Sequence, residues 1–194
     1  MKLLWSKTLE TERLLLHKTK EKDLKKIWEI LCIEDVSKYY LTTKINYNRE
    51  DEKKWQYKKL EEAANPDIFR WTIELKDSNK VIWQIDITEN SDFNDIEIRD
   101  IGLFIDPNYQ GKWYAYEAAF EILKYMFLEV WIKSIRTSAA IDNPSSRKLM
   151  EKLWFKRLDG TKFTKYTLLD NEIEAYKYEL SKEDFVWARN GAEE

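Results

Sequence analysis

Glycine is scarce in this chain, which has 194 residues but only 4 glycines beside 9 tryptophans. An average glycine usage of about 7% would give roughly three times as many. Glycine is the residue that most readily adopts positive φ and lets a backbone approach a ligand closely. Turns that need these properties must therefore be made largely by other residue types.

Cysteine and histidine are each present once, as Cys32 and His17. A single cysteine excludes an internal disulfide and disfavours a cysteine-based zinc site. A single histidine excludes metal sites built from histidine pairs and disfavours a Ser-His-Asp triad. We therefore expect no metal, and we expect His17 to be a surface or strand-end residue rather than a base.

No strong charge imbalance or long apolar run is present. The 33 basic and 36 acidic residues give a formal net charge of -3, which argues against a nucleic-acid protein with a broad basic surface. No apolar run approaches the roughly 20 residues of a membrane span, and no signal-peptide core follows Met1. A cytoplasmic protein with neither a nucleic-acid nor a membrane partner is the expectation.

The apolar periodicity predicts a single α+β domain over residues 1–194, with a mixed, mostly antiparallel sheet. The core is expected over about residues 8–180, and the polar tail 181–194 is expected to fray. Predicted strands cover residues 11–16, 69–75, 80–88, 96–105, 133–141, 155–158, 163–169 and 173–180. Predicted helices cover residues 22–33, 48–64, 113–127 and 145–153, and Asn48 is a candidate cap for the second.

The most informative stretch is residues 96–127, a strand, a short loop and a helix. Asp106, Pro107 and Asn108 end the strand, and the helix begins near Trp113. This geometry points backbone N–H groups at an anion. The alternative is an ordinary strand-to-helix connection in which Lys112 is simply solvated.

Residues 110–115 of this loop resemble the acyl-CoA pyrophosphate loop of GCN5-related N-acetyltransferases. That pattern is Gln or Arg, two residues of any kind, Gly, any residue, then Gly or Ala. Gln110, Gly111, Lys112, Tyr114 and Ala115 fit it. Trp113 stands where the pattern has glycine, and an indole there could block the close approach of backbone amides to a phosphate.

Two further segments resemble the RimJ/RimL branch, which acetylates ribosomal-protein N-termini. Residues 11–16 resemble its opening strand. Residues 140–155 resemble its second cofactor motif, which reads Asn, two residues, Ser, then Leu-Glu-Lys-Leu-Gly-Phe. The resemblance covers about residues 8–180 and implies the acyl-CoA N-acyltransferase fold, with helices on both faces of the sheet.

The resemblance implies that acetyl-CoA is the cosubstrate and that no metal is used. The strands over residues 96–105 and 133–141 would be neighbours that diverge at their carboxyl ends. The first would pair with the pantetheine arm, the loop would hold the pyrophosphate, Asn143 would hydrogen-bond the pantetheine arm, and Ser146 would lie near the sulfur. The implied cofactor-binding residues are Leu103, Phe104, Ile105, Gln110, Gly111, Lys112, Trp113, Tyr114, Ala115, Asn143 and Ser146.

The implied reaction is direct attack of a primary amine on the thioester. The amine must lose a proton, and with one histidine the base would be a carboxylate, acting directly or through water. Glu97 and Asp100 are the candidates, although carboxylates at such positions are more often solvent-facing or ion-paired. Met150 stands where many members have a proton-donating Tyr, which leaves Ser146 as the candidate donor to the thiolate.

The acceptor amine remains open between a protein N-terminus, a polyamine and another small amine, and the oligomeric state is not indicated. Because Trp113 replaces the loop glycine, the alternative function is a catalytically silent domain of the same fold that binds a ligand or partner.

The tryptophans fall into two groups. Trp28, Trp55 and Trp71 occupy apolar positions where an aromatic side chain is ordinary. A second group stands where glycine is expected, and it consists of Trp5, Trp83, Trp113, Trp131 and Trp154. We hypothesise that a codon for glycine in the source is rendered as tryptophan, since UGG and GGG differ by one base and UGA is reassigned in some lineages. The alternative is genuine divergence to tryptophan.

Overall fold

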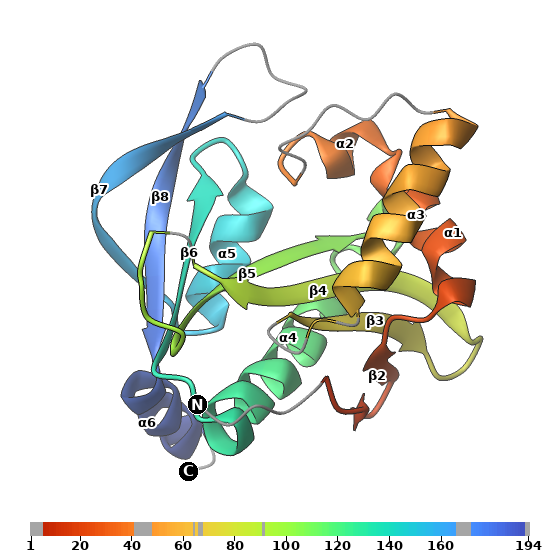
Figure 1. Cartoon of the computed structure of the whole chain (residues 1–194). Helices are drawn as coiled ribbons and strands as arrows, with labels where there is room; N and C mark the ends of the chain where they lie inside the picture. Colours follow the sequence, from red (N-terminus) through yellow and green to blue (C-terminus); the bar gives the residue numbers. More distant parts are fainter. Residues whose placement is uncertain are drawn as a thin grey trace.

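The computed structural model describes residues 6–40, 48–63, 65, 68–90, 92–165 and 172–192. Its strands form an eight-stranded sheet in the order β1-β2-β3-β4-β5-β6-β8-β7 (Figure 1). Every neighbouring pair is antiparallel except β5 and β6, which are parallel. The strands are β1 (Leu9–Glu10), β2 (Leu14–Lys18), β3 (Phe69–Leu75), β4 (Lys80–Glu89), β5 (Ile98–Ile105), β6 (Ser134–Ala140), β7 (Lys156–Lys165) and β8 (Glu172–Ser181).

Helices cover both faces of this sheet, as Figure 1 shows. The helix α1 contacts β4 and α3, whereas α4 contacts β1, β2 and α5. The helices are α1 (Glu21–Leu31), α2 (Glu34–Ser37), α3 (Arg49–Ala63), α4 (Tyr114–Tyr125), α5 (Pro144–Lys152) and α6 (Lys182–Ala192), with a 3-10 turn η1 (Pro107–Tyr109) and a π-helical turn η2 (Met126–Val130). The predicted fold class is therefore confirmed. No helix within the described ranges is both long and apolar enough to span a bilayer.

The main hydrophobic core lies between the sheet and α4. Alternate β4 residues Trp83, Ile85 and Ile87 are fully buried and belong to the same cluster as Ala118 and Ile122 of α4. Alternation follows from the two-residue period of a strand, and the α4 contacts follow from helical spacing. Burying each large aliphatic side chain stabilises the fold by about 1.5–3 kcal/mol. A second cluster joins Ile27, Ile30 and Leu31 of α1 to Val36 and Phe104.

Several local predictions are confirmed. The hairpin of β3 and β4 forms as expected, with Leu75 opposite Lys80. The helices near residues 22–33, 48–64 and 145–153 all form. Asn48 caps α3, because its side-chain oxygen accepts hydrogen bonds from the backbone N–H groups of Glu50 and Asp51, both at 2.9 Å.

Other element boundaries were wrong. The first strand does not include residues 11–13, because the Thr11 N–H bonds to the Leu14 carbonyl in a turn and the strand then runs to Lys18. The two strands expected at 155–158 and 163–169 are one strand, β7, and residues 166–169 lie outside the described part. The short helix α2 was not predicted, since four residues carry too little periodicity.

The expectation for His17 is confirmed in part. It lies near the end of β2 as expected but is buried, with only 4% of its surface exposed. Its Nδ1 lies 3.0 Å from the Lys18 carbonyl oxygen, and its Nε2 lies 3.4 Å from the Glu74 carboxylate. With Asp23 these side chains form a buried polar group, and β2 can therefore carry a polar residue inside the sheet.

The C-terminal tail does not fray over residues 182–192, where it forms α6. Phe185 is fully buried, and its ring lies 5.2 Å from that of Phe127 and 5.8 Å from that of Phe120. One anchoring aromatic residue therefore docks a segment whose overall composition is polar.

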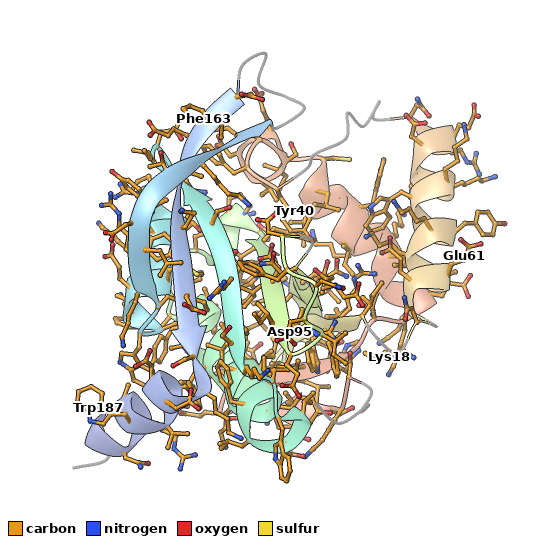
Figure 2. All side chains as sticks on the ribbon, turned by 60° about the vertical axis from the view of Figure 1, so that its left-hand side comes forward. Lys18, Tyr40, Glu61, Asp95, Phe163 and Trp187 are labelled. Carbon is orange, nitrogen blue, oxygen red and sulfur yellow. The ribbon has the colours of Figure 1, made fainter. Side chains whose placement is uncertain are left out.

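We expect Phe185→Ala to destabilise the protein by about 3–5 kcal/mol, because the change leaves a cavity in the aromatic cluster. Thermal and urea unfolding measure this loss. Trp187→Ala is the matched control, since Trp187 of the same helix is 81% exposed and points away from the molecule (Figure 2), so stability should change by less than about 0.5 kcal/mol. Equal effects of the two changes would show that α6 is not docked through Phe185.

Candidate active site

The strands β5 and β6 part soon after they meet. They pair at Ile98 with Ser134 and at Arg99 with Ile135. Beyond this point the Thr137 hydroxyl donates to the Ile101 carbonyl at 3.2 Å, while β5 continues to pair with β4 as far as Ile105. The predicted divergence at the carboxyl ends of the two strands is therefore confirmed.

A cavity of about 660 Å³ opens at this parting. It is lined by the end of β5, the loop before α4, the first turn of α4 and the start of α5. The α2 segment, here residues 35–40, also contributes to the lining. The predicted cofactor residues that line it are Leu103, Phe104, Ile105, Gln110, Gly111, Trp113, Tyr114, Ala115, Asn143 and Ser146. Lys112 is not part of the lining, and its Nζ lies 5.3 Å from the centre of the Tyr109 ring.

The loop before α4 is fixed by its own hydrogen bonds. The Asp106 carboxylate accepts from the Asn108 backbone and side chain at 3.0 and 2.9 Å. Gly111 has φ of +74°, a conformation that favours glycine, although nothing lies within 4 Å of where its Cβ would be. Helix α4 then begins with Trp113 as its N-cap, so the unpaired N–H groups of its first turn face the cavity where an anion would be stabilised.

Trp113 adopts φ of +68° and keeps 58% of its surface exposed. Its ring is therefore more than half exposed, and it meets the Tyr116 ring with 6.0 Å between centres. The Lys152 ammonium lies 3.6 Å from the centre of the indole, a cation–π contact. Lys152 and Lys148 also line the cavity from α5, so this end is suited to a polyanion.

Asn143 is held in place by its role as N-cap of α5. Its side-chain oxygen accepts the backbone N–H of Ser146 at 3.2 Å. The side-chain amide nitrogen is then the group that remains to donate to a ligand. Pro144 follows at the first helical position, where its missing N–H costs nothing.

The structure does not bring Glu97 to the cavity. Glu97 precedes β5, at the opposite end of the strand from Leu103, and its carboxylate lies 3.1 Å from Lys133 Nζ. Asp100 does not line the cavity either, but it shares a strand face with Gly102 and Phe104, as alternate residues do. Burial is the main cause that raises the pKa of the Asp100 carboxyl above its usual value, so a base acting through water remains a prediction for Asp100.

A buried polar network beside the cavity was missed from the sequence. The Tyr40 hydroxyl donates to Asp86 Oδ2 at 2.9 Å, and Asp86 also accepts from Arg70 Nε at 2.6 Å and Nη2 at 3.2 Å. Arg70 Nη1 in turn lies 2.9 Å from Glu62. Burial, and next the charge of Asp86, raise the pKa of the Tyr40 hydroxyl well above its usual 10. The available signal was polar Gln84 and Asp86 alternating with apolar residues along β4.

Glu117, in the first turn of α4, ties this helix to the start of the chain. Its carboxylate accepts from the Thr11 hydroxyl, from Arg13 N at 3.1 Å and from Arg13 Nε at 2.7 Å. Burial opposes ionisation, but these hydrogen bonds outweigh it and hold the pKa of the carboxyl below its usual 4.5. The charged form is therefore the one that stabilises the fold.

We expect Glu117→Gln to lower stability by about 1–3 kcal/mol at pH 7. Because the folded-state pKa is depressed, the wild-type advantage is present above pH 4.5 and is lost as pH falls through the lower folded-state value. Unfolding of both proteins between pH 3 and 7 measures this. A constant difference across that range would contradict the assigned role.

Comparisons with known proteins agree with this geometry. A family model described as an acetyltransferase (GNAT) domain matches residues 13–156. An uncharacterized N-acetyltransferase, YnaD of Bacillus subtilis, is 29% identical over 149 residues, which is 77% of this chain and 82% of that protein. The chain therefore belongs to the GNAT acetyltransferase family and is an N-acetyltransferase that uses acetyl-CoA as its cosubstrate.

Solved structures show the same fold. A GNAT-family acetyltransferase from Bacillus anthracis superposes with a TM-score of 0.75 at 27% identity, covering 91% of this chain and 99% of that one. A spermidine N-acetyltransferase from Vibrio cholerae, in complex with CoA and spermine, gives 0.75 at 18% identity, with coverage of 91% and 99%. A ribosomal-protein-S5-alanine acetyltransferase from Vibrio fischeri gives 0.74 at 17% identity, with coverage of 92% and 98%.

Proposed function

We propose that this N-acetyltransferase acts on a cationic primary amine, either a protein N-terminus or a polyamine, and that it belongs to the RimJ/RimL-like branch. The observation that carries the proposal is the charge distribution of the cavity. Lys148 and Lys152 line it from α5, whereas Asp35 and Lys38 line it from the segment that contains α2, and Asp142 lines it from the turn before α5. The carboxylates of Asp35 and Asp142 would favour a positively charged acceptor in their part of the cavity.

The similar structures support amine acceptors of both kinds. One is named a spermidine N-acetyltransferase and another a ribosomal-protein-S5-alanine acetyltransferase. Both acceptors present a primary amine that is protonated near neutral pH. The shared requirement is a cavity that accepts a cation and then releases one proton from it.

The residues of this chain are proposed to divide the reaction between them. The open edge of Leu103–Ile105 would pair with the pantetheine arm, and the α4 N-terminus with Lys148 and Lys152 would hold the phosphates. Asn143 would donate its amide N–H to the pantetheine arm. Ser146 would lie near the sulfur and supply the proton that the leaving thiolate needs.

Calorimetric titration with acetyl-CoA, followed by thiol release with an amine panel, tests this function. The panel holds spermidine, spermine, a peptide that begins with alanine, and the same peptide with its N-terminus blocked. Turnover with a free amine and none with the blocked peptide is the expected result. Binding of acetyl-CoA without turnover of any amine would favour the catalytically silent alternative that Trp113 suggests.

We expect Asn143→Ala to weaken acetyl-CoA binding or turnover by the equivalent of about 1–3 kcal/mol, through the loss of one or two hydrogen bonds. The same change removes the cap of α5, which alone costs about 0.5–2 kcal/mol of stability. Asn143→Ser separates these effects, because serine can cap a helix but has no amide to donate. Stability should recover in the serine variant while affinity or turnover stays low; full recovery of both would show that capping is the whole role of Asn143.

A further inference from the structure

Tyr40 lies directly on the segment of β5 that borders the cavity. A Cβ added at Gly102 would be 3.5 Å from Tyr40 Cε2 and 3.8 Å from its hydroxyl oxygen. The Tyr40 ring also meets the Phe104 ring edge-on, with 4.6 Å between centres. Tyr40 itself lines the cavity, and Figure 2 shows it between the α2 segment and the sheet. Its hydroxyl therefore lies beside Gly102, the residue immediately before Leu103 of the cavity lining.

The direction of the Tyr40 hydrogen bond is fixed by its partner. Asp86 is 7% exposed and is paired with Arg70, which is 4% exposed, so Asp86 can only accept. The one hydroxyl proton of Tyr40 is thereby committed to Asp86. The oxygen of Tyr40 is left as an acceptor on a residue that lines the cavity.

We infer that Tyr40 contacts the acceptor amine, its oxygen accepting a hydrogen bond from an amine N–H and so directing the nitrogen lone pair at the thioester carbon. The inference rests on the proposed function. The ammonium first loses one proton to cavity water; the amine nitrogen then forms the new C–N bond as the C–S bond breaks, and the second proton of the nitrogen replaces the one that the thiolate takes from Ser146. Tyr40 keeps its own proton throughout, because burial and Asp86 hold it.

Tyr40→Phe tests the inference, since it removes the oxygen and keeps the ring. We expect the kcat/KM for spermidine or the alanine peptide to fall at least tenfold, while acetyl-CoA binds with unchanged affinity and stoichiometry. Tyr57→Phe is the matched control, because Tyr57 is 70% exposed on α3, and it should behave as wild type. A merely structural role would instead lower the acetyl-CoA stoichiometry together with turnover.

Asp86→Asn supplies a second test that keeps the Tyr40 hydroxyl. An asparagine amide can donate to the Tyr40 oxygen, which turns the hydroxyl proton toward the cavity and against the amine N–H. Amine kcat/KM should again fall at least tenfold with acetyl-CoA affinity unchanged. Wild-type rates in both variants would overturn the role of Tyr40 and leave the proposed function standing. A wild-type protein that is inactive on every amine would overturn both the proposed function and the role of Tyr40.

A second, independent observation concerns the backbone at three tryptophans. Trp113, Trp131 and Trp154 have φ of 68°, 67° and 64°, and Asn79 is the one other non-glycine residue with positive φ in the described part of the chain. This region is disfavoured for residues with a Cβ and is visited mainly by Gly, Asn and Asp. Three bulky residues there have a common explanation.

The three positions are helix ends, and two of them are C-terminal ends, where a left-handed residue is usually glycine. After α5, the Trp154 N–H bonds to the Glu151 carbonyl and the Phe155 N–H bonds to the Met150 carbonyl. This pair of bonds defines a Schellman motif whose left-handed residue is usually glycine. Trp131 is the left-handed C-cap of η2, and Trp113 is the left-handed N-cap of α4.

Trp83 also stands where glycine is expected, but the evidence is a strand irregularity rather than a positive φ. It sits at an irregularity of β4, where Ile73 pairs with Trp83 but Glu74 pairs with Val81. A glycine in a strand commonly marks such a bulge. The indole Nε1 of Trp83 is buried, and no partner for it exists among the residues that the structure describes.

The remaining core tryptophans differ on each count. Trp71 Nε1 donates to the Lys7 carbonyl at 2.8 Å. Trp28 and Trp55 pack on each other with ring centres 5.5 Å apart. None of the three has positive φ.

We propose that the native protein carries glycine at positions 83, 113, 131 and 154, and that a glycine codon is rendered as tryptophan in this sequence. Trp5 lies outside the described residues and is not included. Peptide mass spectrometry of the protein isolated from its source should find glycine at all four positions. Tryptophan masses there would overturn the proposal.

The recombinant chain offers a second test. Replacing Trp113, Trp131 and Trp154 together by glycine should raise the melting temperature and tighten acetyl-CoA binding, because the backbone is already in a glycine conformation. The matched control replaces Trp28, Trp55 and Trp71 by glycine, which should lower the melting temperature. A lower melting temperature for the first variant would contradict the proposal.

Discussion

The feature on which this structure depends is that β5 and β6 each have a second neighbour. β5 remains paired with β4 to its end at Ile105, and β6 remains paired with β8 from Ser134 to Ala140. Adjacent strands in a sheet are rotated by roughly 20–25° relative to each other, so two strands that follow different partners separate once their own ladder stops. The separation leaves backbone groups of β5 without a strand partner, and a strand-like ligand can satisfy them.

The two faces of the central strands then serve different purposes. The face toward α4 is apolar and supplies most of the core. The opposite face buries Arg70 and Asp86, whose desolvation is costly unless each charge has a partner. Their mutual pairing, with Tyr40 and Glu62 at its two ends, meets that requirement. The same requirement restricts Tyr40 to one position beside the cavity.

The tryptophans show how firmly the fold sets local backbone conformation. The ends of η2 and α5 and the start of α4 need a left-handed residue to close their hydrogen bonds, whatever side chain is present. The indoles at these positions are accommodated in two ways: Trp113 and Trp131 are 58% and 52% exposed, whereas the ring of Trp154 lies 5.8 Å from that of Phe120 and 6.1 Å from that of Phe185. The backbone conformation thus identifies these positions as ones suited to glycine, which the tryptophan side chains themselves would not indicate.

The sequence by itself determined the features that local chemistry controls. Hydrophobic periodicity located the hairpin, α1 and the strand–loop–helix unit, Asn48 identified a helix cap, and the spacing of Gln110, Gly111 and Asn143 indicated the family. These signals are legible because each depends on residues a few positions apart. Element ends were less accurate, since the ends of strands depend on partners rather than on the strand itself.

Only the tertiary structure decided which distant residues meet. Tyr40 and Asp86 are 46 positions apart, and Thr11 and Glu117 are 106 apart. No periodicity reports such contacts. The polar composition of residues 181–194 predicted fraying, whereas Phe185 packs against Phe120 and Phe127. Glu97 was a candidate base, but the direction of β5 places it at the end of the strand away from the cavity. Proximity across the chain arises from packing of the whole sheet, and for that reason local sequence patterns could not supply it.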